Sequence, residues 1–210
     1  GSPVQSELIY NKIRALAKKN NVKVLTIAED VAASGGYMLM CSGDKLLANK
    51  SSIVGSIGVI SASFGFKELI EKIGVQRRIF TAGENKSFLD PFIDVQDKDV
   101  EKLINVQKSI FENFKTLVLN NRKNKIDPDK VCNGEFWTGE QALELGLIDS
   151  NETLNTYLDN SYGKNYTVRP IESKKSFLKS LFASKGSSSD GMTGLLGTLY
   201  EEAYWSRYGR

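Results

Sequence analysis

The fold is indicated by residues 22–41, which read Val22-Lys23-Val24-Leu25-Thr26-Ile27-Ala28, a loop, and then Ser34-Gly35-Gly36-Tyr37-Met38-Leu39-Met40-Cys41. The first run is apolar and rich in β-branched residues, which predicts a buried strand. The second run opens with small residues and continues with large apolar ones, which predicts a short buried helix. A strand that passes through a tight turn into a helix is the building unit of layered α/β folds.

Helical and extended patterns alternate on both sides of this stretch, and they predict an α/β fold with a mostly parallel sheet flanked by helices. A capping serine, Ser6, and a capping box of Thr138 with Gln141 mark two of the helix starts. The first predicted helix has an apolar face at Leu8, Ile9, Ile13, Leu16 and Ala17. Further helices are predicted at 66–73, where Gly74 ends the helix, at about 97–122, at 138–146, and after Asn151. The predicted strands lie at 22–28, 46–48, 75–81 and 166–171, and residues 53–60 are predicted as a strand or an extended loop.

The chain divides into three predicted parts. Residues 1–184 have the mixed composition of one catalytic-size domain. Residues 185–194 are rich in Gly and Ser, which predicts a flexible linker. Residues 195–210 are apolar and aromatic, which predicts a docking helix, and its stripe at Leu195, Leu196, Leu199, Ala203 and Tyr204 is our candidate for part of an oligomer interface.

Composition excludes several classes of function. The 28 basic and 25 acidic residues leave a net charge of +3 and form no basic stripe, so we expect no nucleic-acid partner. Apolar runs stay below the roughly 20 residues that span a bilayer, so we expect this piece of chain to be soluble.

Histidine is absent, which excludes a histidine-ligated zinc site and any Ser-His-Asp or Cys-His device within this chain. Cys41 and Cys132 are far apart in sequence and read as small apolar residues, with a disulfide between them left open. We expect neither a metal nor a cofactor.

Ser34 is the candidate nucleophile. The predicted helix would begin at this serine, where free N–H groups and the helix dipole favour negative charge. Gly35 and Gly36 have no side chains, so a substrate carbonyl could approach their N–H groups as in an oxyanion hole. The alternative is a tight structural turn, because Ser-Gly-Gly is common in loops.

A serine nucleophile needs a base, and without histidine the candidates are lysine, aspartate or glutamate. Lys86 follows the predicted strand at 75–81 and the turn at Gly83. The segment resembles a phosphate-binding loop only superficially, because Asn85 stands where that loop needs glycine. The alternative for Lys86 is an ordinary solvated lysine.

Three motifs follow one another along the chain, Val31-Ala32-Ala33-Ser34-Gly35-Gly36-Tyr37, Gly55-Ser56-Ile57-Gly58-Val59, and Thr81-Ala82-Gly83 with Lys86. In this order and spacing they resemble the signal peptide peptidase A/SohB family of membrane-bound serine peptidases. The likeness continues through Phe136-Trp137-Thr138-Gly139 to Gly146-Leu147-Ile148-Asp149, so it covers about residues 1–150.

The resemblance implies a Clp-protease/crotonase-like fold and a catalytic dyad of Ser34 and Lys86. It implies that Ser56 orients the lysine and that the Gly35 N–H is one oxyanion donor. It also implies that strands preceding the first helix in this family are missing from the start of this chain, together with part of the oxyanion hole.

The same resemblance implies an endopeptidase that cleaves hydrophobic or unfolded peptides, such as signal-peptide remnants and membrane-protein segments. It implies a homo-oligomer at a bacterial-type inner membrane, attached through an anchor absent from this chain, with the catalytic domain on the periplasmic side. Two alternatives stay open, a non-hydrolytic binding or scaffold protein of the same fold, and an acyl-CoA enzyme of the crotonase type.

Overall fold

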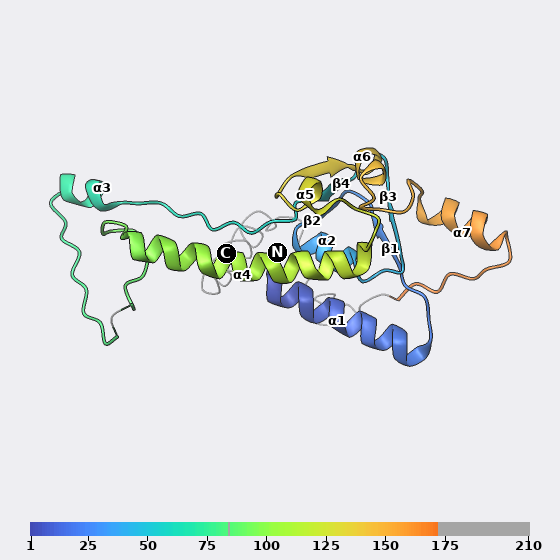
Figure 1. Ribbon diagram of the computed structural model, residues 1–210, viewed down its shortest axis with the longest axis horizontal. Coiled ribbons are helices and arrows are strands. Elements are labelled where there is room, and N and C mark those ends of the chain that lie inside the picture. The colour runs from blue at the N-terminus through green and yellow to red at the C-terminus, as the bar shows by residue number, and fades with distance from the viewer. Residues whose placement is uncertain (84, 172–210) are drawn as a thin grey trace, which may run out of the picture. The chain divides into compact units, whose positions relative to one another are not determined.

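The computed structural model describes residues 1–83 and 85–171, and the predicted linker 185–194 and docking helix 195–210 lie outside the described residues. Residues Gly1–Asn165 form one compact unit. Within it, short strands lie between helices, as Figure 1 shows. The described elements confirm the predicted α/β class.

Two pairs of parallel strands form the centre of this unit. The strands are β1 (Leu25–Ala28), β2 (Val31–Ala33), β3 (Lys45–Ala48), β4 (Ile53–Gly55) and β5 (Phe136–Thr138). β1 pairs with β3 and β2 pairs with β4, both in parallel, while β5 joins β4 in the antiparallel direction. Parallel pairing therefore places the carboxyl ends of β2 and β4 at one edge of their sheet.

Seven helices are described in the part of the chain that the structure covers. They are α1 (Pro3–Asn20), α2 (Gly35–Met40), α3 (Lys67–Lys72), α4 (Asp97–Arg122), α5 (Pro128–Val131), α6 (Gly139–Glu144) and α7 (Leu154–Tyr162). α4 has the bounds that its apolar periodicity predicts. The predicted capping box at the start of α6 is confirmed, since Thr138 and Gln141 each bond the other's backbone.

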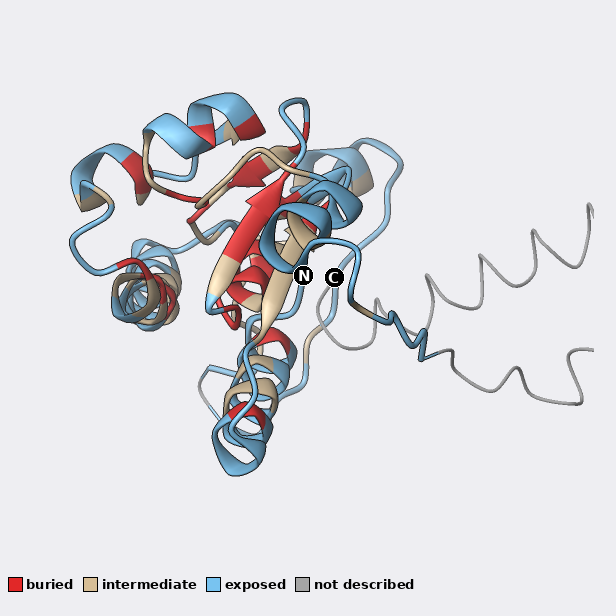
Figure 2. Ribbon diagram, turned by 90° about the vertical axis from the view of Figure 1, so that its right-hand side faces the viewer, coloured by how far each residue is buried: buried red, intermediate tan, exposed pale blue. Residues whose placement is uncertain are grey.

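The core gathers around α2 and the two strand pairs, where Figure 2 shows the buried residues in red. Tyr37 is fully buried, and its hydroxyl donates to the Leu147 carbonyl at 2.8 Å. That bond fixes α2 against the segment after α6 and satisfies a polar group that would otherwise be costly to bury. Further core side chains are those of Met40, Cys41, Leu46, Val54, Ile57, Phe114, Val118, Val131 and Ile148.

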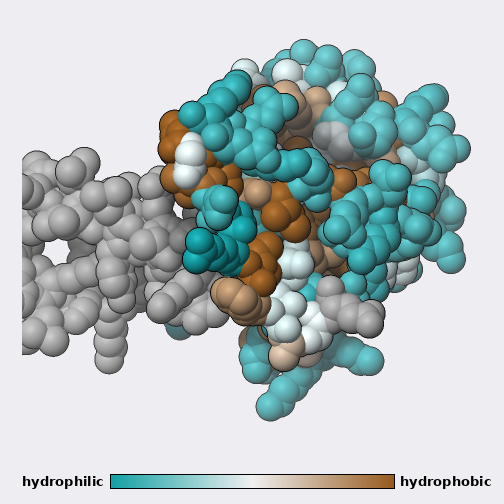
Figure 3. All heavy atoms as spheres, turned by 90° about the vertical axis from the view of Figure 1, so that its left-hand side faces the viewer, coloured by the Kyte–Doolittle hydropathy of each residue, from teal (hydrophilic) through white to brown (hydrophobic). Residues whose placement is uncertain are grey.

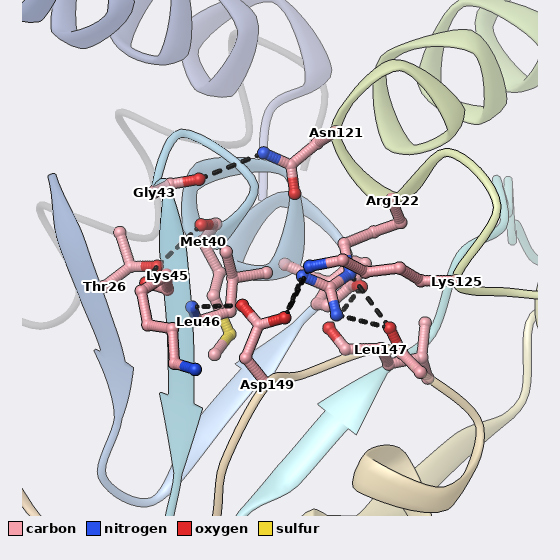
Figure 4. A network of polar contacts seen from close by, with 12 residues as sticks. Thr26, Met40, Gly43, Lys45, Leu46, Asn121, Arg122, Lys125, Leu147 and Asp149 are labelled. Carbon is pink, nitrogen blue, oxygen red and sulfur yellow. Dashed lines mark hydrogen bonds and ion pairs between the residues drawn. The ribbon is translucent and has the colours of Figure 1, made fainter. Parts of the chain in front are cut away.

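A buried arginine joins α4 to this core. Arg122, only 1% exposed, donates to the Gly146 carbonyl through Nε at 2.9 Å and to the Asp149 carboxylate at 3.0 Å. Lys125 also reaches Asp149 at 2.7 Å, and the Leu46 N–H donates to its second oxygen at 2.9 Å. Figure 4 shows Arg122 and Lys125 converging on Asp149. The network ties the last turn of α4 to β3.

Residues 60–96, which we call the arm, leave the core after β4 and return to the start of α4 (Figure 1). α3 lies in the arm and buries none of its residues. Large apolar side chains are exposed here, with Phe80 at 93% and Ile60 at 88%. Seen from the side of α3, Figure 3 shows brown apolar residues exposed among hydrophilic ones. The arm therefore presents apolar surface to solvent.

Three local predictions are wrong. Ser2, rather than Ser6, caps α1, because the helix begins at Pro3 and places Ser6 in its buried face. The predicted strands at 75–81 and 166–171 are not formed, because no neighbouring strand in the described chain pairs with either segment. The predicted apolar face of α1 is wrong in part, since Leu8, Ile9 and Leu16 are exposed, while Ala17 is buried as predicted.

Candidate active site

Ser34 lies between β2 and α2 in a strained backbone conformation. Its φ and ψ angles are 54° and −121°, a region that residues other than glycine rarely adopt. The Ser34 N–H donates to the Gly55 carbonyl at 2.8 Å, and its carbonyl accepts the Met38 N–H at 3.0 Å. The half-buried hydroxyl makes no capping hydrogen bond with α2. The backbone is thus fixed on both sides while the side-chain oxygen stays free to react.

Gly35 is the first residue of α2 and is buried against α1. A Cβ atom placed on Gly35 would lie 2.6 Å from Ser6 Oγ, and the Cα of Gly1 would be 3.5 Å away. Only glycine fits there without displacing its neighbours. The first N–H groups of a helix have no acceptor within the helix, and Gly35 is the first residue of α2.

Ser56 directly follows β4 and is also held at positive φ, 52°. Its N–H donates to the Glu135 carbonyl at 2.7 Å. Since β2 and β4 are parallel neighbours and Ser34 bonds to Gly55, the structure brings Ser34, Gly35 and Ser56 to the same edge of the sheet. Pairing across this edge, which is not visible in the sequence, assembles three of the four predicted site residues.

Lys86 is not brought to this group. It lies in the arm, in a turn where its N–H donates to the Gly83 carbonyl at 3.2 Å. Its side chain is exposed, and within the described residues it forms no ion pair and no hydrogen bond with Ser34. The apolar residues that follow Lys86 in the sequence, Phe88, Leu89 and Phe92, are half-buried and leave the lysine exposed.

Two hollows lie near the core. The larger, about 610 Å³, is at the carboxyl ends of β1 and β3 and is lined by none of the predicted site residues. The smaller, about 80 Å³, has apolar walls from α1, α2 and α4, including Val4, Met38 and Phe114. Met38 lies four residues after Ser34, which is about one helical turn. None of the predicted site residues lines the small groove, and Met38, one turn further along α2 than Ser34, is its nearest lining residue in sequence.

The cysteines carry no reactive chemistry here. Both thiols are free, and Cys41 is fully buried, as the sequence predicts. Burial raises the pKa of the Cys41 thiol to about 12, so it stays protonated at neutral pH. Among the described residues no group of three acidic, histidine or cysteine side chains could hold a metal ion.

The parallel strand pairs and the strained serine at the start of α2 define an α/β protein with a candidate nucleophile at a strand–helix junction. The chain belongs to peptidase family S49, whose family model matches residues 16–162. This match confirms the family resemblance that the motifs around Ser34, Ser56 and Lys86 predict. It also supports the Clp-protease/crotonase-like fold.

Several curated proteins are similar to this chain. A probable protease SohB of Haemophilus influenzae is 34% identical over 136 residues, which is 65% of this chain and 38% of that protein. A putative protease of Synechocystis is 31% identical over 71% of this chain and 53% of its own length. A Brucella abortus protein named Na(+)/H(+) antiporter NhaA is 44% identical over the whole chain and 30% of its own length.

This chain therefore spans between about a third and about half of the length of these relatives. The antiporter name describes a protein of which this chain matches 30%, and that name indicates nothing about Ser34. No helix in the described residues has the length and apolarity needed to cross a membrane.

Sequence reasoning missed two features around the site. The first is the contact of Ser6 with Gly35, which joins residues 29 positions apart and leaves no local signal. The second is the burial of Arg122. A signal for it was present, since Arg122 continues the spacing of Phe114 and Val118 along the buried face of α4.

Proposed function

We propose that the protein is a serine peptidase in which Ser34 is the nucleophile and Lys86 the general base. The observation that carries this proposal is the strained Ser34, with its free hydroxyl, at the amino end of α2. Strain of this kind costs about 1–3 kcal/mol and gathers at functional sites. Membership of peptidase family S49 supports the same reaction class.

The reaction follows from the chemistry of these groups. Ser34 Oγ attacks the carbonyl carbon of a peptide bond while its proton passes to the uncharged amine of Lys86. The Gly35 N–H donates to the oxygen that becomes negative. The resulting ammonium then protonates the leaving amine, which leaves an ester on Ser34, and water hydrolyses that ester by the same proton transfers. Ser56 would orient the lysine through a hydrogen bond.

Lys86 must reach Ser34 for this reaction, and two routes are open. Either the arm moves within one chain, or the arm of a second copy delivers its lysine. A base must be uncharged, and removal of an amine from water favours its uncharged form. Contact of the exposed arm with an apolar surface would therefore both position and activate Lys86. The exposed Ile60 and Phe80 support such a contact.

Hydrophobic peptide segments are the substrates we propose. The small groove, which Met38 lines one turn further along α2 than Ser34, has apolar wall residues such as Val4 and Phe114, which suit an apolar side chain. Attachment of the whole protein to a membrane, and a periplasmic site, would bring it to such substrates, and both are part of this proposal.

A fluorophosphonate probe, which bonds covalently to activated serines, tests the dyad in the full-length protein. We expect labelling of the wild type and none in Ser34→Ala. Lys86→Ala and Lys86→Arg should label at least about a hundredfold more slowly. Alanine has no basic group, and the guanidinium of arginine cannot act as a base in this pH range. Ser56→Ala should label more slowly by a smaller factor. Lys12→Ala, at an exposed position of α1, is the matched control and should label normally.

Mixing the two inactive variants separates the routes. If the lysine comes from a second copy, Ser34→Ala chains should restore labelling of the intact Ser34 in Lys86→Ala chains. No restoration would favour movement of the arm within one chain. Wild-type labelling of Lys86→Ala would contradict the dyad, and absence of labelling in the wild type would favour the non-hydrolytic binding protein.

A further inference from the structure

An ion pair in the arm holds together the segments before and after Lys86. Arg77 Nη2 donates to Asp90 Oδ2 at 2.7 Å, and Arg77 Nε donates to the same oxygen at 3.2 Å. The Arg77 guanidinium carbon also lies 5.7 Å from the centre of the Phe92 ring, in cation–π range. The Asp90 side chain is only 9% exposed although it lies in the exposed arm. The Arg77 side chain is 46% exposed, so the pair is shielded from water mainly on the Asp90 side.

Asp90 is the point where the backbone of this loop is fixed. Its second carboxylate oxygen accepts the Phe92 N–H at 2.9 Å. Its own N–H donates to the Ser87 carbonyl at 3.1 Å, and the residue before it, Leu89, is held at a φ of 51°. Hydrogen bonds from Arg77 and from the Phe92 N–H keep the pKa of the Asp90 carboxyl below its usual value. The pair is thus charged at neutral pH.

Turn hydrogen bonds hold the described residues of the loop that carries Lys86, and just after Asp90 the Phe66 N–H donates to the Pro91 carbonyl at 2.6 Å. It consists of consecutive turns, in which Lys86 bonds back to Gly83 and Phe88 bonds back to Asn85. Its described residues form neither helix nor strand, and among them the Lys86 side chain forms no ion pair. The position of Lys86 therefore depends on its backbone, which Asp90 joins to Arg77 on the other side of the loop.

We propose that Arg77 and Asp90 are positioning residues, which hold the turn of Lys86 in the conformation that presents its amine to a serine. This inference rests on the proposed function. Neither residue is a base in the reaction, since an arginine stays protonated and Asp90 is occupied by three donors. Their effect is exerted through the geometry of the loop, where a displacement of about 1 Å can slow a reaction about a hundredfold.

The neighbouring arginine provides a matched control. Arg78 is exposed and forms no ion pair within the described part of the chain. Arg77→Ala and Arg78→Ala remove the same side chain from adjacent positions, so they change net charge equally. Arg77→Lys keeps the charge but replaces two donors on one oxygen with a single ammonium. Asp90→Asn keeps an acceptor for the Phe92 N–H while it removes the ion pair.

The test is the rate of fluorophosphonate labelling of Ser34 in the full-length protein, separated into the affinity for the probe, the maximal rate constant and the final fraction labelled. We expect Arg77→Ala and Asp90→Asn to lower the maximal rate constant at least about tenfold, with affinity and final fraction unchanged. Arg77→Lys should be intermediate, and Arg78→Ala should equal the wild type. A merely structural role would lower the final fraction and the melting temperature instead.

Two outcomes would overturn the inference, and both differ from failure of the dyad. A wild-type rate constant in Arg77→Ala, with Lys86→Ala inactive, would show that the dyad works without this ion pair. A loss in Arg77→Ala that follows protein unfolding would assign the pair to stability alone. If Lys86→Ala itself labelled normally, the proposed function would fail first, and the positioning role with it.

Discussion

Gly35 shows how closely the residues around the candidate nucleophile are fitted. An alanine at this position would bring its methyl group to 2.6 Å from Ser6 Oγ. We predict that Gly35→Ala lowers the free energy of unfolding by about 1–3 kcal/mol, the usual cost of overpacking. Thermal and urea unfolding followed by circular dichroism would measure this loss.

Ser6→Ala supplies the control, because it removes the oxygen that collides. The double variant should recover most of the stability that Gly35→Ala loses, since Ser6 Cβ is 3.6 Å from the same point, an ordinary contact distance. Additive effects of the two substitutions would contradict this account of the Gly35 site.

At the scale of elements, the end of α4 is fixed by charges around Asp149. Burial alone would raise the pKa of the Asp149 carboxyl, but hydrogen bonds from Lys125 and the Leu46 N–H, with the charge of Arg122, outweigh it and lower that pKa. A carboxyl whose pKa is lower in the folded state stabilises the fold above its unfolded pKa of about 3.9. That contribution is lost as the pH falls toward the folded value.

We predict that Asp149→Asn destabilises the protein at pH 7 and has progressively less effect below about pH 4. Removal of one member of a buried ion pair lowers the free energy of unfolding by about 3–5 kcal/mol. We expect a loss of about 3 kcal/mol here, because the second cation beside Asp149, Lys125, is half exposed. Urea unfolding of both proteins between pH 7 and pH 3 measures the difference. A difference that stays constant with pH would show that this carboxylate contributes by packing rather than by charge.

For the whole molecule, the exposed apolar residues of the arm predict self-association. Phe80 is 93% exposed, and exposed apolar clusters of this kind mark contact surfaces. We predict an oligomer whose mass by light scattering falls in Phe80→Glu, while Phe80→Leu keeps it. Unchanged mass in Phe80→Glu, with an unchanged circular dichroism spectrum, would exclude Phe80 from the interface. Deletion of 186–210 tests the separate prediction that the C-terminal stripe takes part.

The sequence by itself determined the features that depend on neighbours along the chain. The bounds of α4, the capping box at Thr138 and Gln141, and the start of a helix at Ser34 were all predictable. Helical periodicity and capping are set by residues three or four positions apart, so a single sequence contains their full signal. The family motifs added Lys86 and Ser56 as candidates by their order and spacing.

Only the tertiary structure decided which residues meet. Parallel pairing of β2 with β4 brings Ser56 to Ser34, and packing of α1 on α2 brings Ser6 to Gly35. The segment 75–81 has the composition of a strand but forms none, because a strand needs a partner for its backbone groups and none lies beside it in the described chain. Lys86 is exposed for a similar reason, since burial depends on contacts between distant segments and the arm has few with the core.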